Sequence, residues 1–126
     1  MIETTRELYD AFNRGDIEAI LARLDPEVEI HDPDRTGTTH RGPEGYRAFI
    51  EEWLESWEWY SVEVREVIRN GDHVLVDLVQ AGVGKGSGIE VTQPFTQVLT
   101  FRDGKVARFM IFAERADGER AAGLRD

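Results

Sequence analysis

Cysteine is absent from the 126 residues of this sequence. Its absence excludes disulfide bonds, thiolate catalysis and cysteine-ligated zinc sites. A chain without disulfides fits a reducing compartment, so we expect a cytoplasmic protein. The histidines His31, His40 and His73 do not have the spacing of metal ligands. We therefore expect a protein that carries neither a metal nor a cofactor.

Long hydrophobic runs are also missing. No stretch approaches the roughly 20 apolar residues that a membrane-spanning helix needs. Residues 1–7 lack a basic segment followed by an apolar one, so we expect neither membrane insertion nor a secretory signal. Hydrophobic residues make up 40% of the chain and charged residues 32%, which is typical of a globular protein. This length and composition predict a single domain over residues 1–126.

Positive charge is scarce relative to negative charge. The chain has 15 Lys and Arg against 25 Asp and Glu, a formal net charge of −10 at pH 7. A polyanion or an anionic membrane surface would be repelled on average, so we expect no nucleic-acid or membrane partner. The acidic residues are distributed along the chain, which favours a solubilising role for them.

Helical spacing of apolar residues marks the helices. Residues 2–14 predict a first helix, which Gly15 ends and after which Asp16 caps a short second helix. The face of that second helix carries Ile17, Ile20, Leu21 and Leu24. A third helix begins at Pro43 and bears the apolar stripe Tyr46, Phe49, Ile50, Trp53, Leu54 and Trp57.

Alternating and apolar runs predict the strands. The first covers residues 28–32 and is followed by a loop over residues 33–42. A meander of strands follows from residue 59, with hairpin signals at Asn70-Gly71 and Asp103-Gly104. Its first strand is expected to place Tyr60, Val62, Val64 and Ile68 on one side. Residues 116–126 are expected to add a turn of helix, and the order of elements predicts an α+β fold.

Several short motifs are spread over the whole chain, and their order is informative. They are Phe12-Asn13-Arg14-Gly15-Asp16, Asp32-Pro33, Gly42-Pro43-Glu44-Gly45, Gly86-Ser87-Gly88, residues 101–106 and residues 121–124. This order resembles the nuclear-transport-factor-2-like superfamily and, within it, the SnoaL-like branch that includes polyketide cyclases and ketosteroid isomerase. The resemblance implies a cone-shaped, curved antiparallel (mixed) sheet wrapped around three helices, with an apolar pocket.

The resemblance also gives positions to catalytic groups. The family's general base lies at the end of strand one, where this chain has Asp32. The isomerase has an oxyanion hole of a helix-one tyrosine and a carboxylic acid on the fourth strand. By spacing these positions fall at Leu8, with Tyr9 one residue away, and at Gln97. The resemblance therefore implies a base with an altered oxyanion hole, in which Gln97 and Tyr9 would polarise an oxygen.

Asp32 has two interpretations. A carboxylate at the mouth of an apolar cavity could move a proton on a carbon next to a carbonyl group. An Asp-Pro pair could instead simply start a turn. Strand alternation puts Asp32 on the face of Val28 and Ile30, so we expect Asp32 to point inward and His31 outward. Asp34-Arg35 is expected in the loop.

Two classes of function remain open for this sequence. The first is cofactor-free proton transfer (isomerase, cyclase or dehydratase) on a small apolar or aromatic carbonyl compound, with Asp32 as the catalytic base. The second is a non-catalytic ligand-binding or dimeric interaction module. In both, we expect a substrate pocket lined by Tyr9, Phe49, Trp53, Phe95, Gln97, Leu99, Phe109 and Ile111. Whether this pocket is open or filled by its own aromatic side chains is left open.

Proteins of this fold commonly pair through the sheet, so the resemblance also implies a homodimer. An outward face bearing Val62, Val74, Val76 or Val98 would suit that contact.

Overall fold

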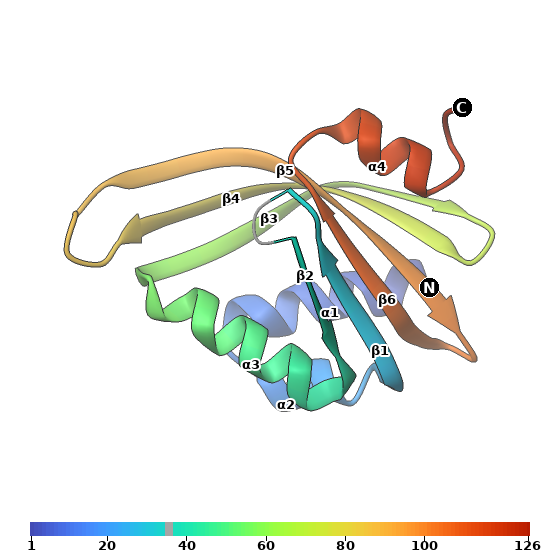
Figure 1. Cartoon of the computed structure of the whole chain (residues 1–126), viewed down its shortest axis with the longest axis horizontal. Coiled ribbons are helices and arrows are strands. Elements are labelled where there is room, and N and C mark those ends of the chain that lie inside the picture. The colour runs from blue at the N-terminus through green and yellow to red at the C-terminus, as the bar shows by residue number, and fades with distance from the viewer. Residues whose placement is uncertain (35–36) are drawn as a thin grey trace.

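A computed structural model describes residues 1–34 and 37–126, and in them it shows four helices and a six-stranded sheet (Figure 1). The helices are α1 (Ile2–Arg14), α2 (Ile17–Leu21), α3 (Gly42–Glu55) and α4 (Arg115–Ala121). The strands are β1 (Leu24–Asp32), β2 (Thr38–Arg41), β3 (Trp57–Asn70), β4 (His73–Gly84), β5 (Glu90–Arg102) and β6 (Lys105–Phe112). The α+β class is confirmed; Arg35, expected in the loop after β1, lies outside the described residues.

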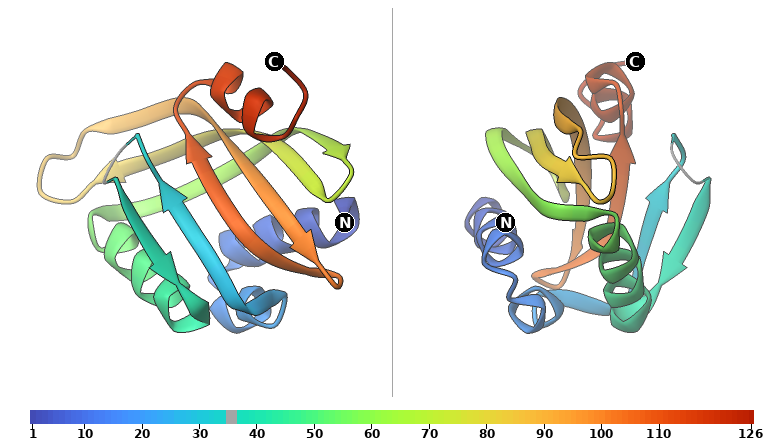
Figure 2. Two further views of the ribbon diagram at one scale, coloured as in Figure 1. Left: turned by 45° about the vertical axis from the view of Figure 1, so that its right-hand side comes forward. Right: turned by 90° about the vertical axis from the view of Figure 1, so that its left-hand side faces the viewer.

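The strands are ordered β2-β1-β6-β5-β4-β3 in one mixed sheet. All neighbours are antiparallel except β1 and β6, which run parallel with Ile30 opposite Phe109. The sheet is strongly curved, with α1, α2 and α3 on its concave side and α4 on its convex side (Figures 1 and 2). This is the cone-like arrangement that the motif order implies. The main core, which includes Leu8, Ile20, Val28, Ile30, Val76 and Leu99, fills the space between the helices and the sheet.

The junction between α1 and α2 follows the sequence prediction. Gly15 adopts the left-handed conformation at φ 74°, which a residue without a Cβ adopts at little cost. The Asp16 side chain then caps α2 by accepting a hydrogen bond from the Ala19 amide at 3.1 Å. Leu24 was expected on the face of this helix but begins β1, where it pairs with Val106. The turn between Leu21 and Leu24 therefore brings the chain into the sheet earlier than the local pattern indicates.

Two elements differ from the sequence prediction for residues 33–57. Strand β2 forms inside the expected loop, because Thr38–Arg41 pairs with residues 29–32 of β1. This short edge strand is polar and has no apolar alternation to reveal it. Trp57 was expected on the third helix but starts β3, since α3 ends at Glu55. Its ring lies against Gly82, where an added Cβ would be 2.7 Å from Trp57 Cε3, so only glycine fits opposite it.

A bulge in β3 moves the end of that strand onto the other face of the sheet. The register shifts between Val64 and Glu66, so two residues of β3 face one of β4. Tyr60 and Val64 pack against the main core, whereas Ile68 packs on the convex face with Leu75 and its neighbours. The expectation that Ile68 shares a side with Tyr60 was therefore wrong.

The valines expected on an outward face do not lie there together. Val62, Val74 and Val76 belong to the core on the concave side, and that part of the prediction was wrong. Val98 lies on the convex side in a second cluster with Leu75, Phe112 and Ala122. Helix α4 packs against β4, β5 and β6 on this side, so Val98 is also buried. Within the described residues, no helix is long and apolar enough to cross a membrane.

Gly118 allows α4 to lie close to the sheet. An added Cβ would be 2.5 Å from Thr96 Cγ2, and Thr96 is 1% exposed and cannot move aside freely. We expect Gly118→Ala to lower the free energy of unfolding by about 1–3 kcal/mol, measured by urea denaturation, because overpacking outweighs the gain in helix propensity. Adding Thr96→Ser removes the obstructing methyl group and should restore much of the loss. An alanine variant as stable as the parent would contradict this packing.

Asn13 ties the end of α1 to the edge strand β3. Its Nδ2 donates to the Val62 carbonyl oxygen at 2.7 Å, and its Oδ1 accepts from the Val62 amide at 3.0 Å. These two bonds satisfy backbone groups that an edge strand otherwise leaves unpaired.

We expect Asn13→Ala to cost about 1–2 kcal/mol in thermal or urea unfolding because both hydrogen bonds are lost. Asn13→Asp keeps the acceptor but places a carboxylate oxygen against the Val62 carbonyl, so it should not restore stability. A negligible effect of both substitutions would show that water replaces this contact.

Candidate functional site

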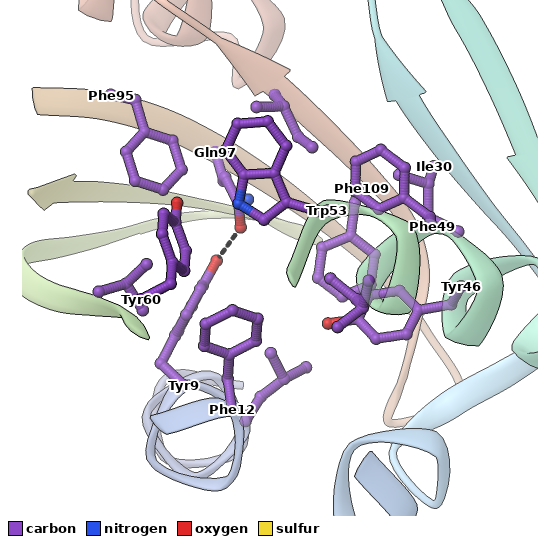
Figure 3. Close-up of a pocket in the computed structure, with 14 residues that line it drawn as sticks. Tyr9, Phe12, Ile30, Tyr46, Phe49, Trp53, Tyr60, Phe95, Gln97 and Phe109 are labelled. Carbon is purple, nitrogen blue, oxygen red and sulfur yellow. Dashed lines mark hydrogen bonds between the residues drawn. The ribbon is translucent and has the colours of Figure 1, made fainter. Parts of the chain in front are cut away.

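A cavity lies between α1, α3 and the concave face of the sheet, and we call it the central cavity (Figure 3). Its lining is mainly apolar and aromatic, and comprises Leu8, Tyr9, Phe12, Ile30, Tyr46, Phe49, Ile50, Trp53, Tyr60, Val62, Phe95, Gln97, Phe109 and Ile111. Helix α1 supplies the first side, α3 the second, and β1, β3, β5 and β6 the floor. The structure thus brings together seven of the residues expected there: Tyr9, Phe49, Trp53, Phe95, Gln97, Phe109 and Ile111.

Leu99 is not part of this lining, contrary to the sequence prediction. Alternation does place Leu99 on the same face of β5 as Phe95 and Gln97. However, Leu99 pairs with Val74 and Phe109 and is completely buried in the main core. Strand periodicity gives the face on which Leu99 lies, but it cannot show whether a cavity or packed side chains lie over that residue.

Tyr9 and Gln97 form a polar pair inside the central cavity. Figure 3 shows the two side chains pointing toward one another, and the Tyr9 hydroxyl donates to Gln97 Oε1 at 2.5 Å. Tyr9 is 5% exposed, and its burial, together with nearby Tyr46, raises its pKa well above the ordinary value for tyrosine. Tyr9 therefore stays a neutral donor under physiological conditions.

This bond fixes the direction of the Gln97 amide. Because Oε1 accepts from Tyr9, the Nε2 group keeps its two hydrogens for another partner. No hydrogen bond from Gln97 Nε2 to any residue in 1–34 or 37–126 is present. The amide is thus oriented to donate to an acceptor atom in the cavity. Leu8, the position at which spacing places the family's helix-one tyrosine, also lines the cavity. Helix α1 therefore turns both Leu8 and its neighbour Tyr9 inward.

The aromatic side chains fill most of the central cavity. Tyr46 lies against Phe109 with ring centroids 5.3 Å apart, and Tyr60 meets Trp53 edge-on at 5.7 Å. Burial raises the pKa of Tyr46 far above its ordinary value. The remaining volume is about 50 Å³, which is room for only a few water molecules at about 10–15 Å³ each. A larger ligand requires some of these rings to turn aside.

Asp32 is buried at the end of β1 but does not line the central cavity. It is 2% exposed and lies on the face of Val28 and Ile30, as alternation predicts. His31 is half-buried on the opposite face, where its Nε2 lies 2.8 Å from Glu29 Oε1. The pair of neighbours thus separates into one inward and one outward side chain.

Asp32 faces two further hollows next to the central cavity. The first, which we call the outer chamber, has a volume of about 120 Å³ and is lined by Asp32, Asp34, Gln80, Gln93, Pro94, Phe95, Ile111, Phe112 and Ala113. The second, the α3 groove, has about 280 Å³ and is lined by Asp32, Thr38, His40, Phe49, Glu52, Trp53 and Ser56. The chamber shares Phe95 and Ile111 with the central cavity, and the groove shares Phe49 and Trp53.

Sequence reasoning missed several polar residues of these hollows. Gln80 is a polar residue on the inward, mainly apolar face of β4, as Gln97 is on that of β5. A search for polar residues on apolar strand faces could have found both. His40 was placed in a loop because β2 has no apolar pattern. Asp34 lies in the turn after β1, as predicted, but its contact was not foreseen: its Oδ2 accepts from the Ala113 amide at 2.8 Å and joins the ends of β1 and β6.

The described residues offer no site for a metal. No group of three or more histidine or acidic side chains in residues 1–34 and 37–126 is arranged to hold an ion. The polar groups at the site and in its neighbouring hollows include the Gln97 amide, tyrosine hydroxyls and the Asp32 carboxylate.

Comparisons with known proteins agree with this architecture. The chain resembles TerC co-crystallised with polyporic acid at 27% identity and a TM-score of 0.81, covering 97% of each chain. It resembles an NTF2-like protein of unknown function from Burkholderia pseudomallei at 27% identity and a TM-score of 0.82, covering 96% of this chain and 95% of that one.

A putative SnoaL-like polyketide cyclase from Jannaschia sp. CCS1 shares the fold at 22% identity and a TM-score of 0.81, covering 99% of this chain and 92% of that one. Among curated proteins there is no significant match. The family profile described as "SnoaL-like domain" matches residues 5–109, so the chain belongs to the SnoaL-like family of the NTF2-like superfamily.

Proposed function

We propose that this protein binds a small, mostly apolar molecule through a carbonyl oxygen held in the central cavity. The observation that carries the proposal is the Tyr9–Gln97 hydrogen bond, which engages the amide oxygen and leaves Gln97 Nε2 as a donor in a mainly apolar space. A few placed polar groups in an apolar pocket are typical of small-molecule sites. TerC, which matches nearly the whole chain, was co-crystallised with polyporic acid, and this supports a small-molecule ligand.

We further propose that Asp32 transfers a proton on the bound molecule. Its carboxylate would remove a proton from a carbon next to the carbonyl group, and the enolate oxygen would accept hydrogen bonds from Gln97 Nε2. Return of the proton to the same or another carbon gives exchange or isomerisation without a cofactor. The ligand must extend past Phe95 and Ile111, or past Phe49 and Trp53, because these side chains separate Asp32 from the central cavity.

Binding without catalysis is the second candidate function. The separation of Asp32 from the central cavity favours it, since a ligand confined to that cavity would not reach the carboxylate.

The expected homodimer and the expected cytoplasmic location stay predictions. Because Val62, Val74 and Val76 are buried in the core, a dimer contact through the sheet would have to use other residues.

Gln97→Leu tests the anchoring of the carbonyl oxygen. We expect it to weaken the binding of 4-phenylcyclohexanone about fivefold, because one neutral hydrogen bond is lost. Tryptophan fluorescence titration measures the affinity. Phenylcyclohexane, which lacks the oxygen, is the matched control ligand and should bind both proteins alike. Equal affinity of the ketone for both proteins would contradict the assignment of Gln97.

Asp32→Asn tests proton transfer separately from binding. In D₂O, we expect the parent protein to exchange the protons next to the carbonyl of 4-phenylcyclohexanone, followed by NMR. The substitution should slow this exchange at least about 100-fold, because the base is lost. Affinity should change less than about twofold.

Asp103→Asn makes the same chemical change in an exposed turn and serves as the control, which should exchange like the parent. Binding of the ketone with no exchange in the parent would support the non-catalytic function.

A further inference from the structure

A second tyrosine–glutamine pair lies at the boundary of the central cavity. The Tyr60 hydroxyl donates to Gln80 Oε1 at 2.7 Å, from the neighbouring strands β3 and β4. Tyr60 lines the central cavity, whereas Gln80 lines the outer chamber. As in the Tyr9–Gln97 pair, the acceptor oxygen of the amide is engaged, so Nε2 remains a donor. No hydrogen bond from Gln80 Nε2 to another described residue is present.

The outer chamber differs in polarity from the central cavity. Its lining includes the carboxylates of Asp32 and Asp34 and the amides of Gln80 and Gln93. Gln80 and Gln93 are directly opposite each other on β4 and β5, so both amides are on the concave face. A hollow with both amide donors and carboxylate acceptors fits a group that accepts and donates hydrogen bonds. A hydroxyl group does both, whereas a ligand carboxylate would be repelled by Asp32 and Asp34.

The two hollows lie on one line along β5. Phe95 lines both, with Gln93 before it and Gln97 after it on the same face of the strand. Four residues of strand separate the positions of Gln93 and Gln97, a span of about 13 Å at roughly 3.3 Å per residue. A molecule that reaches from one amide to the other is therefore elongated, with an apolar body against Phe95 and Ile111.

We propose that the outer chamber binds the hydroxyl end of a hydroxylated aromatic ketone whose carbonyl end is held at Gln97. Gln80 Nε2 donates to the hydroxyl oxygen, and the hydroxyl group donates to Gln93 Oε1, so the Asp32 carboxylate stays available for the proton next to the carbonyl group. The inference rests on the proposed function, since it extends the same ligand from the central cavity into the chamber. It names Gln80, held by Tyr60, as a residue that determines specificity.

The test compares two ketones that differ in one hydroxyl group. We expect 4-(4-hydroxyphenyl)cyclohexanone to bind the parent protein about fivefold more tightly than 4-phenylcyclohexanone, as one or two added neutral hydrogen bonds allow. In Gln80→Leu this advantage should fall to less than about twofold, while the affinity for 4-phenylcyclohexanone stays close to that of the parent. In Gln97→Leu both ketones should bind more weakly and the advantage should persist.

Gln80→Met, which retains the length of the side chain but has no amide, should behave like the leucine variant and serves where that variant folds poorly. No gain from the hydroxyl group in the parent, or a gain that survives both Gln80 substitutions, would overturn the assignment of the chamber. Failure of the proposed function has a different signature. In that case Gln97→Leu leaves the affinity of 4-phenylcyclohexanone unchanged, whatever the hydroxyl group does.

Discussion

The parallel pairing of β1 with β6 is the contact on which the site depends. It joins a strand from the first third of the chain to one near its end, with Ile30 opposite Phe109 and His31 opposite Met110. All other strand neighbours are antiparallel, so this pairing decides where the first strand enters the sheet. It places the end of β1 beside the end of β6, and thereby puts Asp32 in the same hollow as residues of β4 and β5. Without this pairing, the position of the Asp32 carboxylate relative to the Gln97 amide would not be fixed.

The second constraint is the cost of burying polar groups among apolar ones. An amide or hydroxyl removed from water must find a hydrogen-bond partner inside the protein. Tyr9 with Gln97 and Tyr60 with Gln80 meet this requirement pairwise, and each tyrosine hydroxyl has its acceptor on another element of the fold. Pairing has a further consequence, because a fixed acceptor oxygen also fixes where the amide donors point. The polar groups that stabilise the interior are thus the groups that can recognise a ligand.

Packing and ligand binding compete in this interior. The rings of four residues fill most of the central cavity and bury apolar surface in the core: Tyr46, Trp53, Tyr60 and Phe109. The same rings must move for a ligand larger than a few waters. Phe49, Trp53, Phe95 and Ile111 each line the central cavity and one of the neighbouring hollows. Their positions therefore decide whether Asp32 and Gln97 act on one molecule.

The sequence by itself determined the features that depend on neighbours along the chain. These are the Gly15–Asp16 junction, the hairpin turns, the apolar stripe of α3 and the inward direction of Asp32, all of which follow from backbone conformation and periodicity. The tertiary structure alone decided the rest. The bulge in β3 put Ile68 on the other face, and pairing with β1 made a strand of polar residues 38–41. Core packing buried Leu99 while leaving Gln97 in a cavity. Each of these depends on contacts between distant segments, which a local pattern of residues does not encode.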